Sequence, residues 1–283
     1  MKIETWRDPY DAGFSPTKPK EIELNSGLTV LVGCNGAGKS TLLLNIKEYV
    51  EGQNIPCYYY DNLSSGRNSV SSAIFNGNIG LGATLMTSSE GECIKLNLQG
   101  ESGLFDDFLK DGVSKRLKFN IDENVKEVPN IRVMLFDALD SGLSVDSIME
   151  LRIMCDRLLE RAKEFGVELY IIISANEYEL ARKVDCFDVN RGKYITFNDY
   201  EDYRKFIIKT REDKEKRIKR QEIWYENKKQ REEEKYNRLV ERNKTKIESI
   251  KSKAEGRNLT YGEKYRINDL EREIRNEKPS WLK

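Results

Sequence analysis

The chain has 283 residues, of which 34% are charged and 38% hydrophobic, and its formal net charge is zero. It contains no histidine, which excludes Ser-His-Asp triads, histidine general bases and histidine-ligated metal sites. Residues 201–283 hold 26 lysines and arginines against 18 acids, so a C-terminal segment of +8 follows a body of −8. This asymmetry predicts either nucleic acid or another acidic partner for the C-terminal segment, or simply a solvated charged helix.

The five cysteines are scattered without a C-x-x-C pair or a metal-ligand spacing, which is typical of reduced thiols in a cytoplasmic protein. No signal peptide opens the chain, and no apolar run has the length of a membrane span. We therefore expect a cytoplasmic protein that has no membrane partner.

The first predicted elements form a strand, a glycine-rich turn and a helix. Residues 21–24 alternate like a half-exposed strand, and the apolar residues of 28–32 predict a buried one. Residues 33–40 follow directly and read Gly-Cys-Asn-Gly-Ala-Gly-Lys-Ser. An apolar-faced helix then opens at Thr41. This order is the context in which a phosphate-binding P-loop occurs.

The P-loop chemistry assigns a role to each residue type. Its glycines let backbone N–H groups surround the β- and γ-phosphates at a positive helix N-terminus. Lys39 is expected to reach the phosphate oxygens, and the Ser40 hydroxyl to ligate Mg²⁺. A plain glycine turn would explain Gly36 but not the lysine and serine in register. The predicted ATP-binding residues are Gly33, Cys34, Asn35, Gly36, Ala37, Gly38, Lys39, Ser40 and Thr41.

Strands alternate with helices along the rest of the body, which predicts an α/β fold with a mostly parallel sheet over residues 1–200. Residues 62–91 are rich in Gly, Ser and Asn and predict a long irregular segment. Residues 92–118 predict helical pieces interrupted at Gly100 and Gly103. The other predicted elements are strands at 55–60, 131–136 and 167–173, helices at 145–165 and 177–183, and a hairpin about residues 190–193.

Residues 201–283 predict a charged helical extension. A single helix from about 203 to 254 would be about 75 Å long at 1.5 Å per residue. Gly256 ends it, and Thr260 and Glu263 have the spacing of a capping box before a short last helix. A brief 4-3 seam, typical of a weak coiled coil, is formed by Tyr236, Val240, Asn243, Ile247, Ile250 and Ala254.

Asp137 ends the apolar strand at 131–136 and is the expected second Mg²⁺ anchor, usually through a water. The alternative is an aspartate that only ends a strand. The position of Asp137 roughly a hundred residues after the P-loop favours metal binding.

The P-loop, together with the later sequence Phe-Asp-Ala-Leu-Asp-Ser-Gly-Leu-Ser, resembles the ABC-type P-loop ATPase superfamily. The most similar branch is the soluble one of SMC and RecF proteins and the AAA-like ABC ATPases of bacteria and phages. The resemblance covers about residues 1–200. It implies an ATP-binding head that dimerises, with each nucleotide between one P-loop and the other subunit's signature motif. Ser89, Gly91 and Glu92 occupy the signature position, although a surface turn is the alternative there.

Three positions depart from the family pattern. Ala138 stands where the family places its catalytic glutamate, and Asp140 could replace that glutamate or be a turn residue. Ser144 stands at the aspartate of the D-loop. Asn176 stands at the switch histidine, where it can donate a hydrogen bond but cannot carry charge. We therefore expect slow turnover, with the catalytic residues Lys39, Asp137, Asp140 and Asn176.

The leading hypothesis is an ATPase that works as an ATP-dependent homodimer in DNA- or phage-related processes. The alternative is a regulatory or scaffolding protein that binds ATP without hydrolysing it. A small-molecule kinase and a transporter subunit are disfavoured, because neither an arginine-rich lid nor a membrane-docking element is evident. Adenine-stacking candidates are Trp6, Tyr10 and Phe14, and candidates for stacking on nucleic acid are Trp224, Tyr225 and Tyr236.

Overall fold

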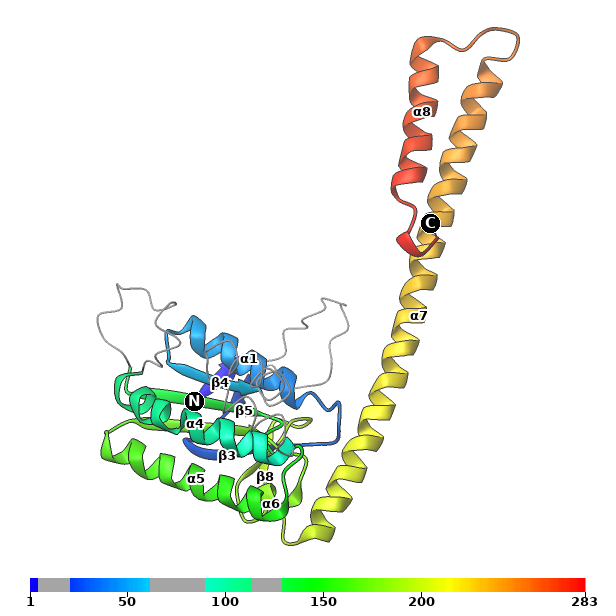
Figure 1. Cartoon of the computed structure of the whole chain (residues 1–283). Coiled ribbons are helices and arrows are strands. Elements are labelled where there is room, and N and C mark those ends of the chain that lie inside the picture. The colour runs from blue at the N-terminus through cyan, green and yellow to red at the C-terminus, as the bar shows by residue number, and fades with distance from the viewer. Residues whose placement is uncertain (5–20, 62–89, 113–128, 283) are drawn as a thin grey trace. The chain divides into compact units, whose positions relative to one another are not determined.

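The computed structural model describes residues 1–4, 21–61, 90–112 and 129–282 (Figure 1). The chain divides into two compact units, Met1–Glu215 and Lys216–Lys283. The long helix α7 (Tyr200–Lys253) begins in the first unit and continues in the second. The first unit therefore includes the opening turns of this helix.

A six-stranded mixed sheet forms the centre of the first unit, in the order β4-β5-β6-β3-β7-β8. Every neighbouring pair is parallel except β7 and β8, which form an antiparallel hairpin. The predicted α/β fold with a mostly parallel sheet is therefore confirmed. The strands are β3 (Gly27–Val32), β4 (Cys57–Asp61), β5 (Ile131–Asp137), β6 (Glu168–Ser174), β7 (Cys186–Asp188) and β8 (Lys193–Ile195).

The two faces of the sheet are covered by different elements, because successive side chains of a strand point to opposite faces. On one face, alternate residues of β3, β5 and β6 pack on α1 (Lys39–Gly52) and on the antiparallel pair β1 (Lys2–Glu4) and β2 (Glu21–Glu23). On the other face they pack on α4 (Glu90–Asp111), α5 (Val145–Glu164), α6 (Tyr178–Ala181) and the start of α7 (Figure 1).

Helix α4 is continuous, so the predicted interruptions at Gly100 and Gly103 are wrong. A glycine within a helix costs only about 1 kcal/mol relative to alanine. That cost is offset by packing, since Ile94 near the start of the helix and Phe105 and Phe108 nearer its end are fully buried in the core. Tertiary contacts at both ends therefore outweigh the local helix-breaking tendency.

The second unit is a helical hairpin formed by α7 from Lys216 onward and α8 (Tyr261–Asn276) (Figure 1). The heptad seam predicted on α7 is used inside the chain, against α8. Its polar member Asn243 is 0% exposed, and its Nδ2 donates to Glu273 Oε2 on α8 at 2.9 Å. Ile247 and Ala254 of the seam and Ile267 of α8 are also buried.

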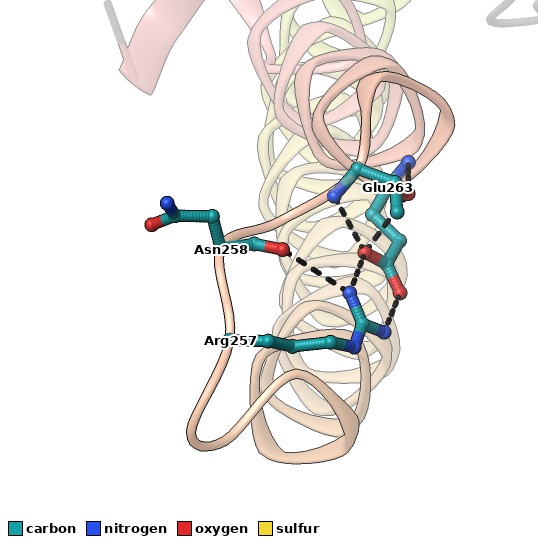
Figure 2. A network of polar contacts seen from close by, with 4 residues as sticks. Arg257, Asn258 and Glu263 are labelled. Carbon is teal, nitrogen blue, oxygen red and sulfur yellow. Dashed lines mark hydrogen bonds and ion pairs between the residues drawn. The ribbon is translucent and has the colours of Figure 1, made fainter.

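The connection between the two helices is fixed by the predicted capping box. Glu263 N–H donates to Thr260 Oγ1 at 3.3 Å, and Thr260 N–H donates back to Glu263 Oε2 at 2.8 Å. Figure 2 shows Arg257 binding both oxygens of Glu263, at 2.7 and 2.9 Å, and donating to the carbonyl of Asn258. This ion pair spans the turn that follows Gly256. Within the described ranges, no helix has both the length and the apolar character needed to cross a membrane.

Candidate functional site

Four chain segments meet at the carboxyl edge of the sheet, where ligands of parallel α/β proteins commonly bind. The neighbours β5, β6 and β3 end there, followed by residues 138–144, 175–177 and 33–38 respectively. Asp61, the last residue of β4, lies in register with Asp137 at the end of β5. The topology therefore collects residues that are far apart in the sequence.

The glycine loop, residues 33–40, links β3 to α1. Gly36 and Gly38 have φ values of +72° and +100°, a left-handed backbone that side chains other than hydrogen rarely allow. The loop also lies open, since Asn35, Gly36 and Ser40 are exposed.

Several amides of this loop are available for a ligand. In the described parts of the chain we find no acceptor for the N–H groups of Gly36, Gly38, Lys39 and Ser40, and no side chain caps the start of α1. A helix N-terminus with free N–H groups carries a partial positive charge. The loop therefore has the donors that a bound phosphate needs.

Lys39 adds a buried cation to this loop. Its side chain is only 8% exposed, and Nζ donates to the carbonyl of Gly33 at 2.9 Å. Burial lowers the pKa of Lys39, and attraction to Asp140, Cys34 and Asp137 opposes that shift without cancelling it. An additional anion on the loop would therefore stabilise the charged form of this lysine.

Asp137 is buried and held by a serine from the neighbouring strand. Ser174 Oγ donates to Asp137 Oδ1 at 2.5 Å, and the same hydroxyl accepts the Ala138 N–H at 2.7 Å. Ala138 has φ of +52°, which is uncommon for a residue with a Cβ. Ala138 is thus held in a strained backbone conformation that Ser174 helps to fix.

Asp140 connects two of the loops at this edge. Its side chain is 2% exposed, and Oδ2 accepts the N–H groups of Asn176 at 2.5 Å and Glu177 at 2.7 Å. Among the residues that the structure describes, its other oxygen, Oδ1, has no hydrogen-bond partner. Burial raises the pKa of Asp140, and the backbone amides of Glu177, Asn176 and Asp140 itself, together with Lys39, oppose this shift without cancelling it. Asp140 is therefore a buried anchor with one unused acceptor, close to the lysine of the glycine loop.

Asn176 lies beside this anchor with its side chain exposed. Its backbone is fixed from both sides, because its N–H binds Asp140 and its carbonyl accepts the Tyr203 hydroxyl of α7 at 2.9 Å. The exposed amide side chain is consequently carried on a well-held segment next to Asp140.

Ser40 and Asp137 are the predicted magnesium ligands. Mg²⁺ usually keeps several waters and is held by one or two carboxylates together with substrate phosphates. The described residues contain no group of three or more metal-ligating side chains. Asp137 has a second oxygen, Oδ2, beyond the one that binds Ser174, and Ser40 is exposed. These donors fit a magnesium ion shared with a phosphate, not a metal site complete in itself.

The structure brings Lys39, Asp137 and Asp140 together and places Asn176 beside Asp140. Gly91 and Glu92 lie in the first turn of α4, and their predicted contact with a partner's nucleotide stays a prediction. Ser89 and the adenine-stacking candidates Trp6, Tyr10 and Phe14 lie outside the described residues.

Sequence reasoning missed four polar residues at this edge. Two end strands, Asp61 and Ser174, and two lie on α7, Thr210 and Lys214, which contact Cys34 and Asn35 of the glycine loop. Asp61 also ends an apolar strand, as Asp137 does, so the same pattern could have identified it. The others reach the site through strand register or helix packing, which leave no local pattern.

Comparison of the chain with protein-family models, with curated proteins and with solved structures gave no match.

Proposed function

We propose that this protein binds ATP with Mg²⁺ at the glycine loop and hydrolyses it slowly, as an ABC-type P-loop ATPase that dimerises on nucleotide. The observation that carries the proposal is the combination of unpaired loop amides with a buried lysine that the protein's own acids do not fully compensate. A polyphosphate would satisfy both at once. The sequence resemblance supplies the choice of ATP and of the DNA- or phage-related setting.

In this proposal the loop amides and the N-terminus of α1 bind the β- and γ-phosphates, and Lys39 neutralises their charge. Ser40 and Asp137 would hold Mg²⁺, which draws charge from the phosphate oxygens when it is bound. Ser174 orients the Asp137 carboxylate by occupying Oδ1. Asn176 would donate a hydrogen bond to the terminal phosphate from its exposed amide side chain.

We expect slow hydrolysis because of the two residues that could activate the attacking water, Ala138 and Asp140. The methyl group of Ala138 cannot accept a proton. Asp140 has an unpartnered oxygen and a raised pKa, both of which suit a general base. Its second oxygen is occupied by two amides, which restricts how far the carboxylate can turn. The median turnover number of enzymes is about 10 per second. We therefore expect the turnover number of this protein to lie well below that value.

A non-hydrolysing scaffold is the second candidate, favoured by Asp140 acting as an anchor for residues 176–177 rather than as a base. In that case ATP would hold two heads together without being consumed. The basic C-terminal segment would then bind the partner, whether nucleic acid or an acidic protein.

An apolar stripe on α5 supports the proposed homodimer. Val145, Met149 and Ile153 are 58, 57 and 50% exposed and lie on one helix face at intervals of four residues. The stripe begins directly after residues 138–144, the loop that follows Asp137 and contains Asp140. Contact between two copies there would bring both nucleotide sites close to the interface.

The test measures ATP binding by calorimetry, steady-state turnover and mass by light scattering for wild type, Lys39→Ala and Asp140→Asn. Binding that is lost in Lys39→Ala supports the proposal, and absence of ATP binding in wild type overturns it. Turnover lost in Asp140→Asn, with the variant accumulating as an ATP-bound dimer, identifies Asp140 as the base. An ATP-dependent dimer whose turnover equals that of Lys39→Ala identifies the scaffold.

Restoring an acid after Asp137 separates the two candidates further. Ala138→Asp is preferable to Ala138→Glu, because aspartate tolerates a left-handed backbone better. A large rise in turnover in Ala138→Asp would show that wild type lacks only the base, as the scaffold requires. Unchanged turnover would indicate that another group, such as Asp140, already acts.

A further inference from the structure

The opening turns of α7 lie against the glycine loop. Thr210 and Lys214 are one turn apart on this helix and therefore share a face. They contact the consecutive loop residues Cys34, Asn35 and Gly36. All of these contacts lie inside the first compact unit, which ends at Glu215.

Thr210 fixes the helix to the loop. Its side chain is buried, and Oγ1 accepts the Cys34 N–H at 3.1 Å while donating to the carbonyl of Ile207 at 2.8 Å. The hydroxyl of Thr210 therefore acts both as an acceptor and as a donor in these contacts. Thr210 consequently sets the position of the next turn of α7, which carries Lys214.

Lys214 places a second ammonium group on the loop. Its Nζ donates to the carbonyl of Asn35 at 2.9 Å. A Cβ built at Gly36 would lie only 2.6 Å from that nitrogen, so Gly36 leaves the space the ammonium occupies. Lys214 has no acidic partner in the described chain, and two of its three N–H donors remain for another acceptor.

We propose that Lys214 is a phosphate-binding residue of the nucleotide site, and that Thr210 positions it. This inference rests on the proposed function and deepens it, because it adds the start of the C-terminal extension to the site. Lys214 reaches the loop at Asn35 and Gly36, so its remaining N–H donors are available to an anion bound there. Lys39 and the N-terminus of α1 are sufficient to bind one phosphate. A second cation at Lys214 therefore indicates a ligand with several phosphates, which is a nucleoside polyphosphate.

The effect of removing this charge should grow with the number of phosphates. Replacing a hydrogen bond between two charged groups weakens binding by about 10-fold or more. We therefore expect Lys214→Gln to weaken ATP binding by about 10-fold and to change AMP binding by less than about 2-fold. Lys214→Arg keeps the charge and should restore most of the affinity for ATP.

The experiment measures dissociation constants for ATP, ADP and AMP with Mg²⁺, using full-length protein. The variants are wild type, Lys39→Ala, Lys214→Gln, Lys214→Arg and Lys209→Ala. Lys209 is the matched control, because it is an exposed lysine of the same helix segment with no contact to the loop. Circular dichroism spectra identical to wild type establish that each variant is folded.

The outcomes separate this inference from the proposed function. If wild type binds ATP and Lys39→Ala does not, but Lys214→Gln binds like wild type, the role of Lys214 is refuted while the proposed function stands. Tighter ATP binding by Lys214→Gln also refutes it, because the lysine would then obstruct the loop. If no variant binds ATP, wild type included, the proposed function itself fails. Equal weakening by Lys209→Ala would show a general charge effect and would overturn the assignment.

Discussion

Asp140 offers the sharpest test of the site, because one buried carboxylate joins two loops at the sheet edge. Asp140→Ala removes the acceptor of the Asn176 and Glu177 amides. An unsatisfied buried donor costs about 1–3 kcal/mol, and both residues are exposed enough for water to replace part of the loss. We therefore expect Asp140→Ala to lower the free energy of unfolding of the first unit by about 2–3 kcal/mol.

Asp140→Asn should cost less, because an amide oxygen can still accept from both N–H groups. It also removes a buried charge. Burial raises the folded-state pKa of Asp140 above its unfolded value, so the native state holds the proton more tightly than the unfolded state. The stability of wild type therefore falls as the pH rises between the unfolded and folded pKa values of this group. The variant lacks that loss, so its stability relative to wild type should improve through the same pH window.

The assay is hydrogen exchange followed by mass spectrometry on β5, β6 and residues 174–180. It is preferred to tryptophan fluorescence because two of the three tryptophans, Trp224 and Trp281, lie in the second unit and would mix its signal with that of the first. Protection of the strands reports the stability of the first unit, and protection of 174–180 reports the local anchor. Equal destabilisation by alanine and asparagine would refute the hydrogen-bond argument. A difference between Asp140→Asn and wild type that does not change with pH would refute the argument from burial.

Four further predictions concern the helical hairpin and the dimer. Asn243→Ala should lower hairpin stability by about 2 kcal/mol, seen as faster exchange in α8 with unchanged exchange in the central sheet. Thr260→Ala should cost about 1 kcal/mol, read from urea-induced loss of helical circular dichroism. The ion pair with Arg257 lowers the pKa of Glu263 to about 2. The contribution of Glu263 to hairpin stability should therefore persist above pH 4.5 and disappear as the pH falls toward 2. Met149→Glu should weaken ATP-dependent dimerisation by at least about 10-fold without changing ATP affinity; an unchanged dimer by light scattering would exclude α5 from the interface.

The sequence predicted those helices and strands whose apolar residues follow the burial seen in the structure. The apolar runs that became β3, β5 and β6 are buried on both faces, which is what a continuous apolar strand indicates. The capping box of α8 was equally readable, because its two partners are three residues apart. Gly100 and Gly103 misled the prediction because the packing of α4, not its local composition, decides that it is one helix.

The heptad seam of α7 shows a different limit of sequence reasoning. Its spacing predicted a surface for another helix, and the described structure places such a helix against it, from the same chain. Asn243 specifies this pairing, because it meets Glu273 only when α8 is in register. A repeat pattern can therefore identify the buried face of a helix without identifying its partner.

The candidate site divides in the same way between local and long-range information. The glycine loop was evident because its pattern is a fixed run of residue types over eight consecutive positions. Ser174 reaches Asp137 because β6 lies beside β5, and Lys214 reaches Gly36 because α7 packs back on the loop. A composition change suggested that the body ends at residue 200, yet the compact unit extends to Glu215. The intervening turns carry Tyr203, Thr210 and Lys214, all of which contact loops of the site. A truncation at residue 200 would therefore remove part of the candidate nucleotide site along with the extension.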